Sequence, residues 1–203
     1  IAEHESRTQH RDLVVAAEVD AGELGLEVVP GDYAFAAETW QFDGARREET
    51  IRACFLPILG GMEISGEPGF DLINGLRSQT RDWIDINRCL TDKLLANKLL
   101  EDAKAALLRQ FRDARRLFQA ENTDRIRIQR ESLRRHLERR TDALRVAMAR
   151  VSESHRANYK RMAEGQIREL RQKHEVAVAA LDQREEPKVM RSGLVSGFVR
   201  IRG

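Results

Sequence analysis

The longest uninterrupted helical signal in this 203-residue chain begins at Asp82. Residues 82–119 contain neither glycine nor proline, and their leucine, isoleucine and phenylalanine residues recur at helical spacing. The pattern predicts one long amphipathic helix over residues 82–121, with Asp82 as a candidate N-cap. A helix of this length dominates the fold that the chain can adopt.

The following region, residues 122–186, contains two apolar-periodic segments of almost equal length on either side of the polar stretch 152–155. Equal lengths around a polar break predict an antiparallel coiled-coil hairpin. One continuous helix of roughly 65 residues is the alternative, and Gly165 weakens either structure. The residues expected at the helix–helix seam are Ile126, Leu133, Leu137, Leu144, Met148 and Val151, then Tyr159, Met162, Ile167, Leu170, His174, Ala177 and Leu181.

The first 81 residues are expected to form a small α+β body. Glycine, proline and aspartate punctuate short apolar runs in this part of the chain. The pattern predicts strands over 13–19 and 24–29, helices over 32–41 and 46–59, and a loop over 60–69. Pro57 disturbs the second of these helices in this interpretation.

Pro187 ends the second helical segment, and the loosely alternating tail 187–203 predicts a short C-terminal β-strand that returns to the body. The predicted fold is therefore mainly α. A small α+β body carries a long amphipathic helix and a projecting antiparallel coiled-coil hairpin. The expected parts are residues 1–81, 82–121, 122–186 and 187–203.

Charge is distributed unevenly along the chain, although the formal net charge is only +2. Residues 1–82 carry 7 basic and 16 acidic side chains, whereas residues 122–186 carry 16 basic and 11 acidic ones. The tail from residue 187 carries four basic side chains and no acid. This asymmetry indicates that the two ends of the chain meet different surroundings.

Catalytic signatures are absent from the sequence. It contains no GxxxxGK[ST] phosphate loop, no HExxH and no GxSxG. Cys54 and Cys89 lack the spacing of a zinc site, and the five histidines do not pair at i, i+4. We expect two reduced thiols, no metal, no cofactor and no small-molecule substrate.

No apolar run approaches the roughly 20 residues that cross a bilayer, and no signal peptide is present. The sequence therefore predicts a cytoplasmic protein without a membrane partner. Because the chain begins at Ile1, we expect it to be a segment of a longer protein.

Arginine is the one informative chemical feature. Its planar fork can donate two hydrogen bonds to one phosphate, so arginines along a helix can follow a nucleic-acid backbone. Interleaved acids are also typical of a solvated helix face, which is the alternative interpretation. The candidate nucleic-acid-binding residues are Arg127, Arg130, Arg134, Arg135, Arg139, Arg140 and Arg145.

Residues 120–203 resemble the C-terminal region of large bacterial Swi/Snf-type helicases, including those of DISARM-like antiphage defence systems. The resemblance is carried by Gly165, Gln166, Ile167, Arg168 and Leu170, then Leu181, Glu185 and Pro187, and then Gly193 and Val195. It implies an accessory region of an ATP-dependent translocase that lies outside the motor. ATP hydrolysis is therefore not assigned to this segment.

On this interpretation the segment is not an enzyme itself. The resemblance implies contact with duplex DNA through the basic arm, and with helicase motor lobes or another subunit of a defence complex. The alternative is a structural coiled-coil module that recruits a protein partner or dimerises.

Overall fold

The computed structural model describes residues 13–78 and 80–203 and shows an α+β chain with one five-stranded mixed sheet. The chain divides into two compact units. Unit 1 comprises the described residues up to Gln41, together with 48–115 and 189–203. Unit 2 comprises 42–47 and 116–188.

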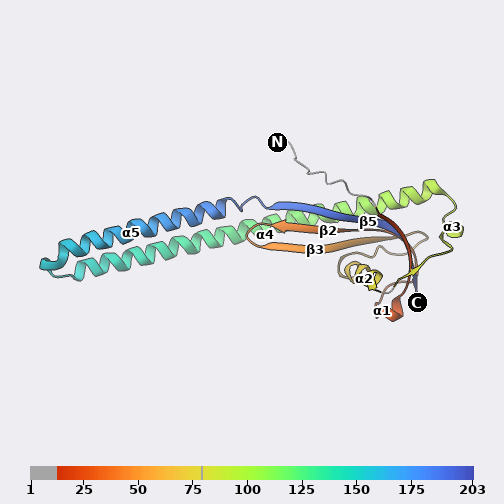
Figure 1. Ribbon diagram of the computed structural model, residues 1–203, viewed down its shortest axis with the longest axis horizontal. Helices are drawn as coiled ribbons and strands as arrows, with labels where there is room; N and C mark the ends of the chain where they lie inside the picture. Colours follow the sequence, from red (N-terminus) through yellow and green to blue (C-terminus); the bar gives the residue numbers. More distant parts are fainter. Residues whose placement is uncertain (1–12, 79) are drawn as a thin grey trace. The chain divides into compact units, whose positions relative to one another are not determined.

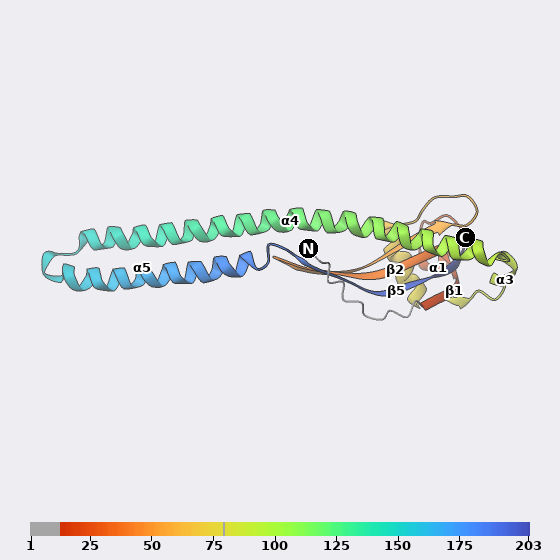
Figure 2. The same ribbon diagram turned by 90° about the horizontal axis from the view of Figure 1, so that it is seen from above.

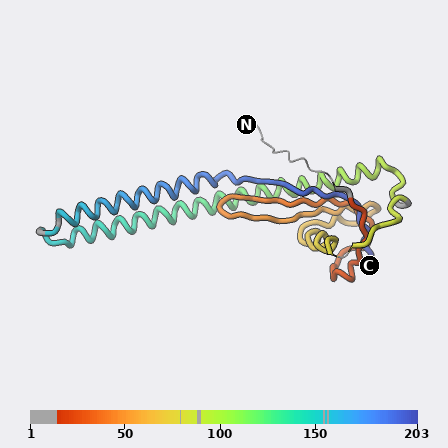
Figure 3. Tube along the Cα trace, in the orientation of Figure 1, coloured from red at the N-terminus to blue at the C-terminus, as the bar shows by residue number. Residues whose placement is uncertain are grey.

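The sheet has the strand order β3-β2-β5-β1-β4. β5 pairs in parallel with β1, from Leu13 opposite Val195 to Asp20 opposite Arg202. The C-terminal strand therefore lies inside the sheet, among strands from the first third of the chain (Figure 3). The strands are β1 (Leu13–Asp20), β2 (Gly31–Asp43), β3 (Arg47–Pro57), β4 (Arg81–Asp82) and β5 (Lys188–Arg202).

The helices are α1 (Ala21–Leu24), α2 (Gly66–Ser78), α3 (Ile86–Cys89), α4 (Lys93–Arg150) and α5 (Glu153–Asp182). Within unit 1, helices cover both faces of the sheet. Successive residues of β2 point to opposite faces, so each residue reports what packs on its own side. Phe35 joins a core cluster with Leu72 of α2, whereas Ala34 joins a cluster with Leu100 of α4. The first part of α4 and α2 therefore enclose the sheet from two sides.

Glycine is required where β5 meets β1. A Cβ atom built on Gly197 would lie 2.0 Å from the backbone oxygen of Val15. Real Cβ atoms do not approach so closely, and the neighbouring atom belongs to the backbone. The parallel pairing of these strands thus depends on the absence of a side chain at position 197.

The prediction of a mainly α fold is wrong, because residues 32–41 and 46–59 form the strands β2 and β3 instead of helices. Residues 33–37 of β2 are all buried, so apolar residues occur at consecutive positions. A short apolar run of this kind does not distinguish a fully buried strand from a buried helix. The expected strand at 24–29 is also wrong, because α1 ends there and no strand follows before Gly31.

The long helix predicted to start at Asp82 begins later and ends later. Asp82 lies in β4, a short α3 follows, and α4 starts at Lys93, where Asp92 Oδ1 accepts a hydrogen bond from Leu94 N at 2.8 Å. α4 then continues without a break through residue 121 to Arg150, a length of 58 residues. Two elements that were expected to be separate are therefore one helix.

The predicted coiled-coil hairpin is not shown either. In unit 2 the second part of α4 and α5 lie side by side (Figures 1 and 2), but burial along α4 does not follow a strict heptad. Between residues 126 and 150 the less exposed positions of α4 follow the series 126, 130, 133, 137, 141, 144 and 148, with 131 and 147 next to it. These steps average about 3.7 residues, close to an 11-residue repeat and distinct from the 3.5 of a left-handed coiled coil.

Most of the expected seam positions are buried or half-buried, and Met162 is the exception. Ile126 is fully buried and the other expected α4 residues are half-buried, whereas the polar Thr141, which was not expected at the seam, is also buried. On α5, Met162 is 48% exposed and the neighbouring Ala163 is buried instead. The continuous-helix alternative is wrong as well, because Val151 and Ser152 interrupt the chain between α4 and α5. The expected short terminal strand is the 15-residue interior strand β5.

Candidate nucleic-acid interface

The seven candidate arginines all lie on α4 within unit 2. Six of them are exposed, and Arg130 is half-buried. They differ in what their guanidinium groups contact, and these contacts divide them into three groups.

Four of the arginines form ion pairs with a carboxylate three or four residues away on the same helix. Such pairs are typical of a solvated helix face, and they neutralise much of the positive charge locally. Arg135 also donates a hydrogen bond to Glu131, which holds the pKa of that carboxyl below its ordinary value. The pairs are Arg127–Asp124 at 3.3 Å, Arg134–Glu138 at 3.6 Å, Arg145–Asp142 at 3.3 Å, and Arg135–Glu131.

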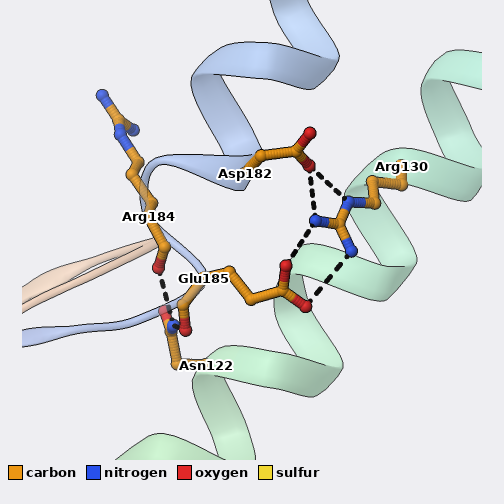
Figure 4. A network of polar contacts seen from close by, with 5 residues as sticks. All are labelled: Asn122, Arg130, Asp182, Arg184 and Glu185. Carbon is orange, nitrogen blue, oxygen red and sulfur yellow. Dashed lines mark hydrogen bonds and ion pairs between the residues drawn. The ribbon is translucent and has the colours of Figure 1, made fainter. Parts of the chain in front are cut away.

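Arg130 forms a different kind of contact, because its two carboxylate partners lie at and beyond the end of α5 (Figure 4). Its Nε donates to Asp182 Oδ1 at 3.1 Å, and its Nη2 donates to Glu185 Oε2 at 2.7 Å. The hydrogen bond and charge of Arg130 lower the pKa of the Glu185 carboxyl. Arg130 therefore cross-links α4 to the chain leaving α5, and this role competes with binding a phosphate.

Asn122 lies one helical turn before Ile126 on the buried side of α4 and is only 2% exposed. Its Nδ2 donates to the backbone carbonyls of Arg184 at 2.9 Å and Glu185 at 3.1 Å (Figure 4). Its Oδ1 accepts a hydrogen bond from Ala45 N at 2.6 Å. One amide thus satisfies three backbone groups from two other segments of unit 2.

The turn between β2 and β3 packs closely against the side-chain amide of Asn122. A Cβ atom on Gly44 would lie 2.4 Å from Asn122 Oδ1, so the close approach requires glycine. On either side of the turn, Phe42 stacks on Phe118 with ring centroids 5.0 Å apart, and Arg46 pairs with Glu121 at 2.9 Å. Sequence reasoning missed this cluster. Its one available signal was an asparagine in line with Ile126 on an apolar helix face.

Arg139 and Arg140 form the third group. Arg139 Nε donates to the backbone oxygen of Arg135 at 3.3 Å. Among the residues that the structure describes, neither guanidinium has a carboxylate partner. These two members of the candidate set therefore have donors available for an external anion.

Unit 1 contains a cavity of about 320 Å³ beside α2, with mainly apolar walls that include Val15, Phe35 and Ile73. Its ionisable wall residues are Glu38 and Arg77. Glu38 is already engaged, because it accepts hydrogen bonds from the Trp40 indole at 3.0 Å and from the guanidinium of Arg191 at 2.8 Å. The cavity walls therefore supply no free pair of groups for acid–base catalysis.

The described residues contain no cluster of three or more His, Cys, Asp or Glu side chains that is arranged to hold a metal ion. Cys54 is buried. This burial is the main cause that raises the pKa of its thiol to about 12, and the nearby charge of Glu63 adds to it. The thiolate needed for nucleophilic chemistry is therefore scarce at neutral pH. Within the same residues, every helix is too short or too polar to cross a membrane.

No protein-family model matches the chain. A search of curated proteins and a search of solved structures likewise found no significant similarity.

Proposed function

We propose that this region is a non-catalytic accessory part of a bacterial Swi/Snf-type DNA helicase or translocase, and that its helical unit 2 contacts duplex DNA. The observation that carries the proposal is the segregation of charge. Residues 122–186 carry 16 basic and 11 acidic side chains, whereas residues 1–82 carry 7 and 16. The resemblance of residues 120–203 to the C-terminal region of such helicases supports the same assignment.

The chemistry of unit 2 favours a duplex over a single strand. Proteins that bind single strands without sequence preference stack bases on aromatic side chains. Residues 122–186 contain a single aromatic residue of that kind, Tyr159, but many arginines that suit backbone phosphates. Binding of this type is independent of sequence and weakens steeply with salt.

Unit 1 has a different role in this proposal. It binds the motor lobes of the parent protein or another subunit of a cytoplasmic antiphage-defence complex. Exposed apolar side chains support a protein contact: Leu59, Ile84 and Leu94 are 90%, 87% and 81% exposed. Leu59 and Ile84 directly follow Ile58 and Trp83, which both belong to the cluster beneath α4. The ATPase activity belongs to the motor in this view.

Fluorescence anisotropy with a labelled duplex at low and moderate salt tests the DNA contact. We expect saturable binding of the 203-residue chain at ~50 mM salt and a marked loss at ~200 mM. An unlabelled single strand of the same length should compete less well than the duplex. Failure to bind the duplex at low salt refutes the proposal.

A protein-interaction or dimerisation module is the alternative, and one observation favours it. Leu117, Ile128 and Val146 are at least half exposed and are spaced by 11 and 18 residues. These spacings correspond to about three and five turns, so the three side chains share one face of α4. Light scattering over a range of concentrations distinguishes this alternative, which requires a dimer that weakens when Ile128→Asp is introduced.

A further inference from the structure

The basic charge of unit 2 is concentrated near the turn that joins α4 to α5. Residues 139–161 carry seven basic and two acidic side chains. The flanking residues 122–138 and 162–186 together carry nine of each. The whole excess of positive charge in residues 122–186 therefore belongs to the 23 residues around the turn.

Over residues 122–150, the acids of α4 lie on one side of the helix. At about 100° per residue, Asp124, Glu131, Glu138 and Asp142 fall within an arc of about 40°. The arginines that pair with these acids along α4 flank this arc, because i, i+3 and i, i+4 neighbours are close on a helix surface.

A second face of α4, which begins about 60° around the helix from this arc, carries no acid over residues 125–150. It includes Arg125, Arg139, Arg140 and Arg150. Arg139 and Arg150 are 11 residues apart, which corresponds to about three turns and places them in line. In the described part of the chain, none of these four arginines has a carboxylate partner.

Arg139, Arg140 and Arg150 belong both to the charge-rich region around the turn and to the acid-free face of α4. These side chains are exposed, lie where the net charge is highest, and share a face without acids. A phosphate that binds there does not have to displace an intramolecular carboxylate. At Arg127, Arg134 and Arg145 it does, because each of these already forms an ion pair.

We propose that unit 2 binds the phosphate backbone of duplex DNA at its turn end, through Arg139, Arg140 and Arg150. This inference rests on the proposed function and narrows the contact from a row of seven arginines to one end of the helix pair. Arg150 is absent from the set expected from sequence, and five members of that set serve ion pairs within the chain.

The size of the surface limits the number of phosphates. Residues 139–150 of α4 extend over about 17 Å, at ~1.5 Å per residue. A duplex carries one charge per ~1.7 Å of its axis, so this length faces a short stretch of backbone. Neutralising about three phosphates contributes roughly −2.7 to the slope of log K against log salt.

A pair of charge-matched triple variants of the 203-residue chain tests the inference. R139Q/R140Q/R150Q removes three arginines from the acid-free face, and R127Q/R134Q/R145Q removes three that are ion-paired. Both lose the same charge, and glutamine has a helix propensity close to that of arginine. Circular dichroism establishes that both remain helical before duplex binding is measured by anisotropy over a salt series.

We expect the first variant to bind about 30-fold more weakly at ~50 mM salt, with a salt slope shallower by about 2 to 3. The matched variant should lose no more than about threefold. An equal or larger loss in the matched variant overturns the assignment to the turn end, but leaves the proposed DNA function standing.

Wild-type protein that does not bind the duplex at low salt removes the proposed function and this inference together. Phosphatidylserine–phosphatidylcholine vesicles provide a further arm, because anionic headgroups also attract arginine. Arginine-dependent binding to these vesicles without binding to the duplex overturns the inference in favour of a membrane surface.

Discussion

The side-chain nitrogen Nδ2 of Asn122 donates a hydrogen bond to the backbone oxygen of Arg184 at 2.9 Å, although 62 residues separate the two. The same amide accepts a hydrogen bond from Ala45 at 2.6 Å. Within unit 2, one buried side chain therefore fixes the turn after β2, the middle of α4 and the chain leaving α5. This convergence leads to the first three predictions.

Replacing Asn122 by alanine should destabilise unit 2 by about 1–3 kcal/mol, because the buried amide that satisfies the Ala45 N–H and two carbonyls is lost. Asn122→Asp should be at least as damaging. Its oxygen still accepts from Ala45, but a carboxylate would face the carbonyls of Arg184 and Glu185. Urea unfolding monitored by circular dichroism measures both effects. An unchanged midpoint for Asn122→Ala would contradict the role assigned to this residue.

Gly44→Ala should lower stability by roughly 1–3 kcal/mol, because the added methyl would lie 2.4 Å from Asn122 Oδ1 and force a shift. Gly165→Ala is the matched control. Its added methyl meets no atom within 4 Å, and it lies inside α5. Alanine should stabilise that helix by about 0.5–1 kcal/mol. Thermal unfolding should therefore move in opposite directions for the two variants.

The Arg130–Glu185 contact predicts a dependence on pH. Arg130 lowers the pKa of Glu185 in the folded protein. The resulting stabilisation is present above the unfolded-state pKa of about 4.3 and is lost as the pH falls through the lower folded value. Arg130→Gln should therefore reduce the free energy of unfolding at neutral pH, and the difference from wild type should shrink in acid.

Carbon-detected NMR titration of the glutamate carboxyls checks this relation directly. Glu185 should titrate below its ordinary pKa in wild type and move up in Arg130→Gln. Glu169 serves as an internal reference, because its pKa is lowered by a separate partner, Lys173. An unchanged Glu185 pKa in the variant would show that Arg130 does not hold this carboxylate.

Cys54 should resist alkylation in the native protein, because it is buried and the pKa of its thiol is raised to about 12. In a Cys89→Ser background, iodoacetamide at pH 8 should label it slowly when folded and rapidly in urea. Mass spectrometry measures the labelled fraction. Rapid labelling of the folded chain would show that the interior of unit 1 opens readily.

Local sequence patterns predicted some elements of this fold but not its class. The strand predicted at 13–19 is confirmed as β1, where glycine and aspartate mark the end of a short apolar run. In β2, by contrast, Tyr33, Phe35 and Trp40 are buried together with the alanines between them. A strand buried on both faces loses the alternation that identifies strands in a sequence.

The late start of α4 has a tertiary cause. Trp83 lies in the cluster beneath α4, and the guanidinium of Arg200 lies 4.4 Å from its ring centroid. Residue 83 therefore belongs to the sheet region, although the sequence around it has helical periodicity. Packing against a strand more than 100 residues away overrides the local preference, and the local pattern contains no sign of that strand.

The candidate site could be read from sequence only in part. The concentration of arginine was visible, and so were the acids three and four positions away that form the ion pairs of Arg127 and Arg135. The link from Arg130 to Asp182 and Glu185 was not, because it depends on how α5 returns along α4. Distinguishing engaged from available arginines therefore required the tertiary structure.

The interior position of β5 determines the order in which the sheet can be completed during synthesis. The hairpin of β2 and β3 and the strand β1 emerge early from the ribosome, but β5 separates them in the sheet and is made after α4 and α5. Until then, β1 and β2 each have a backbone edge without its native neighbour. A nascent chain that stops before residue 188 therefore cannot complete the sheet of unit 1. Insertion of β5 between β2 and β1 is the step that completes the fold of this unit.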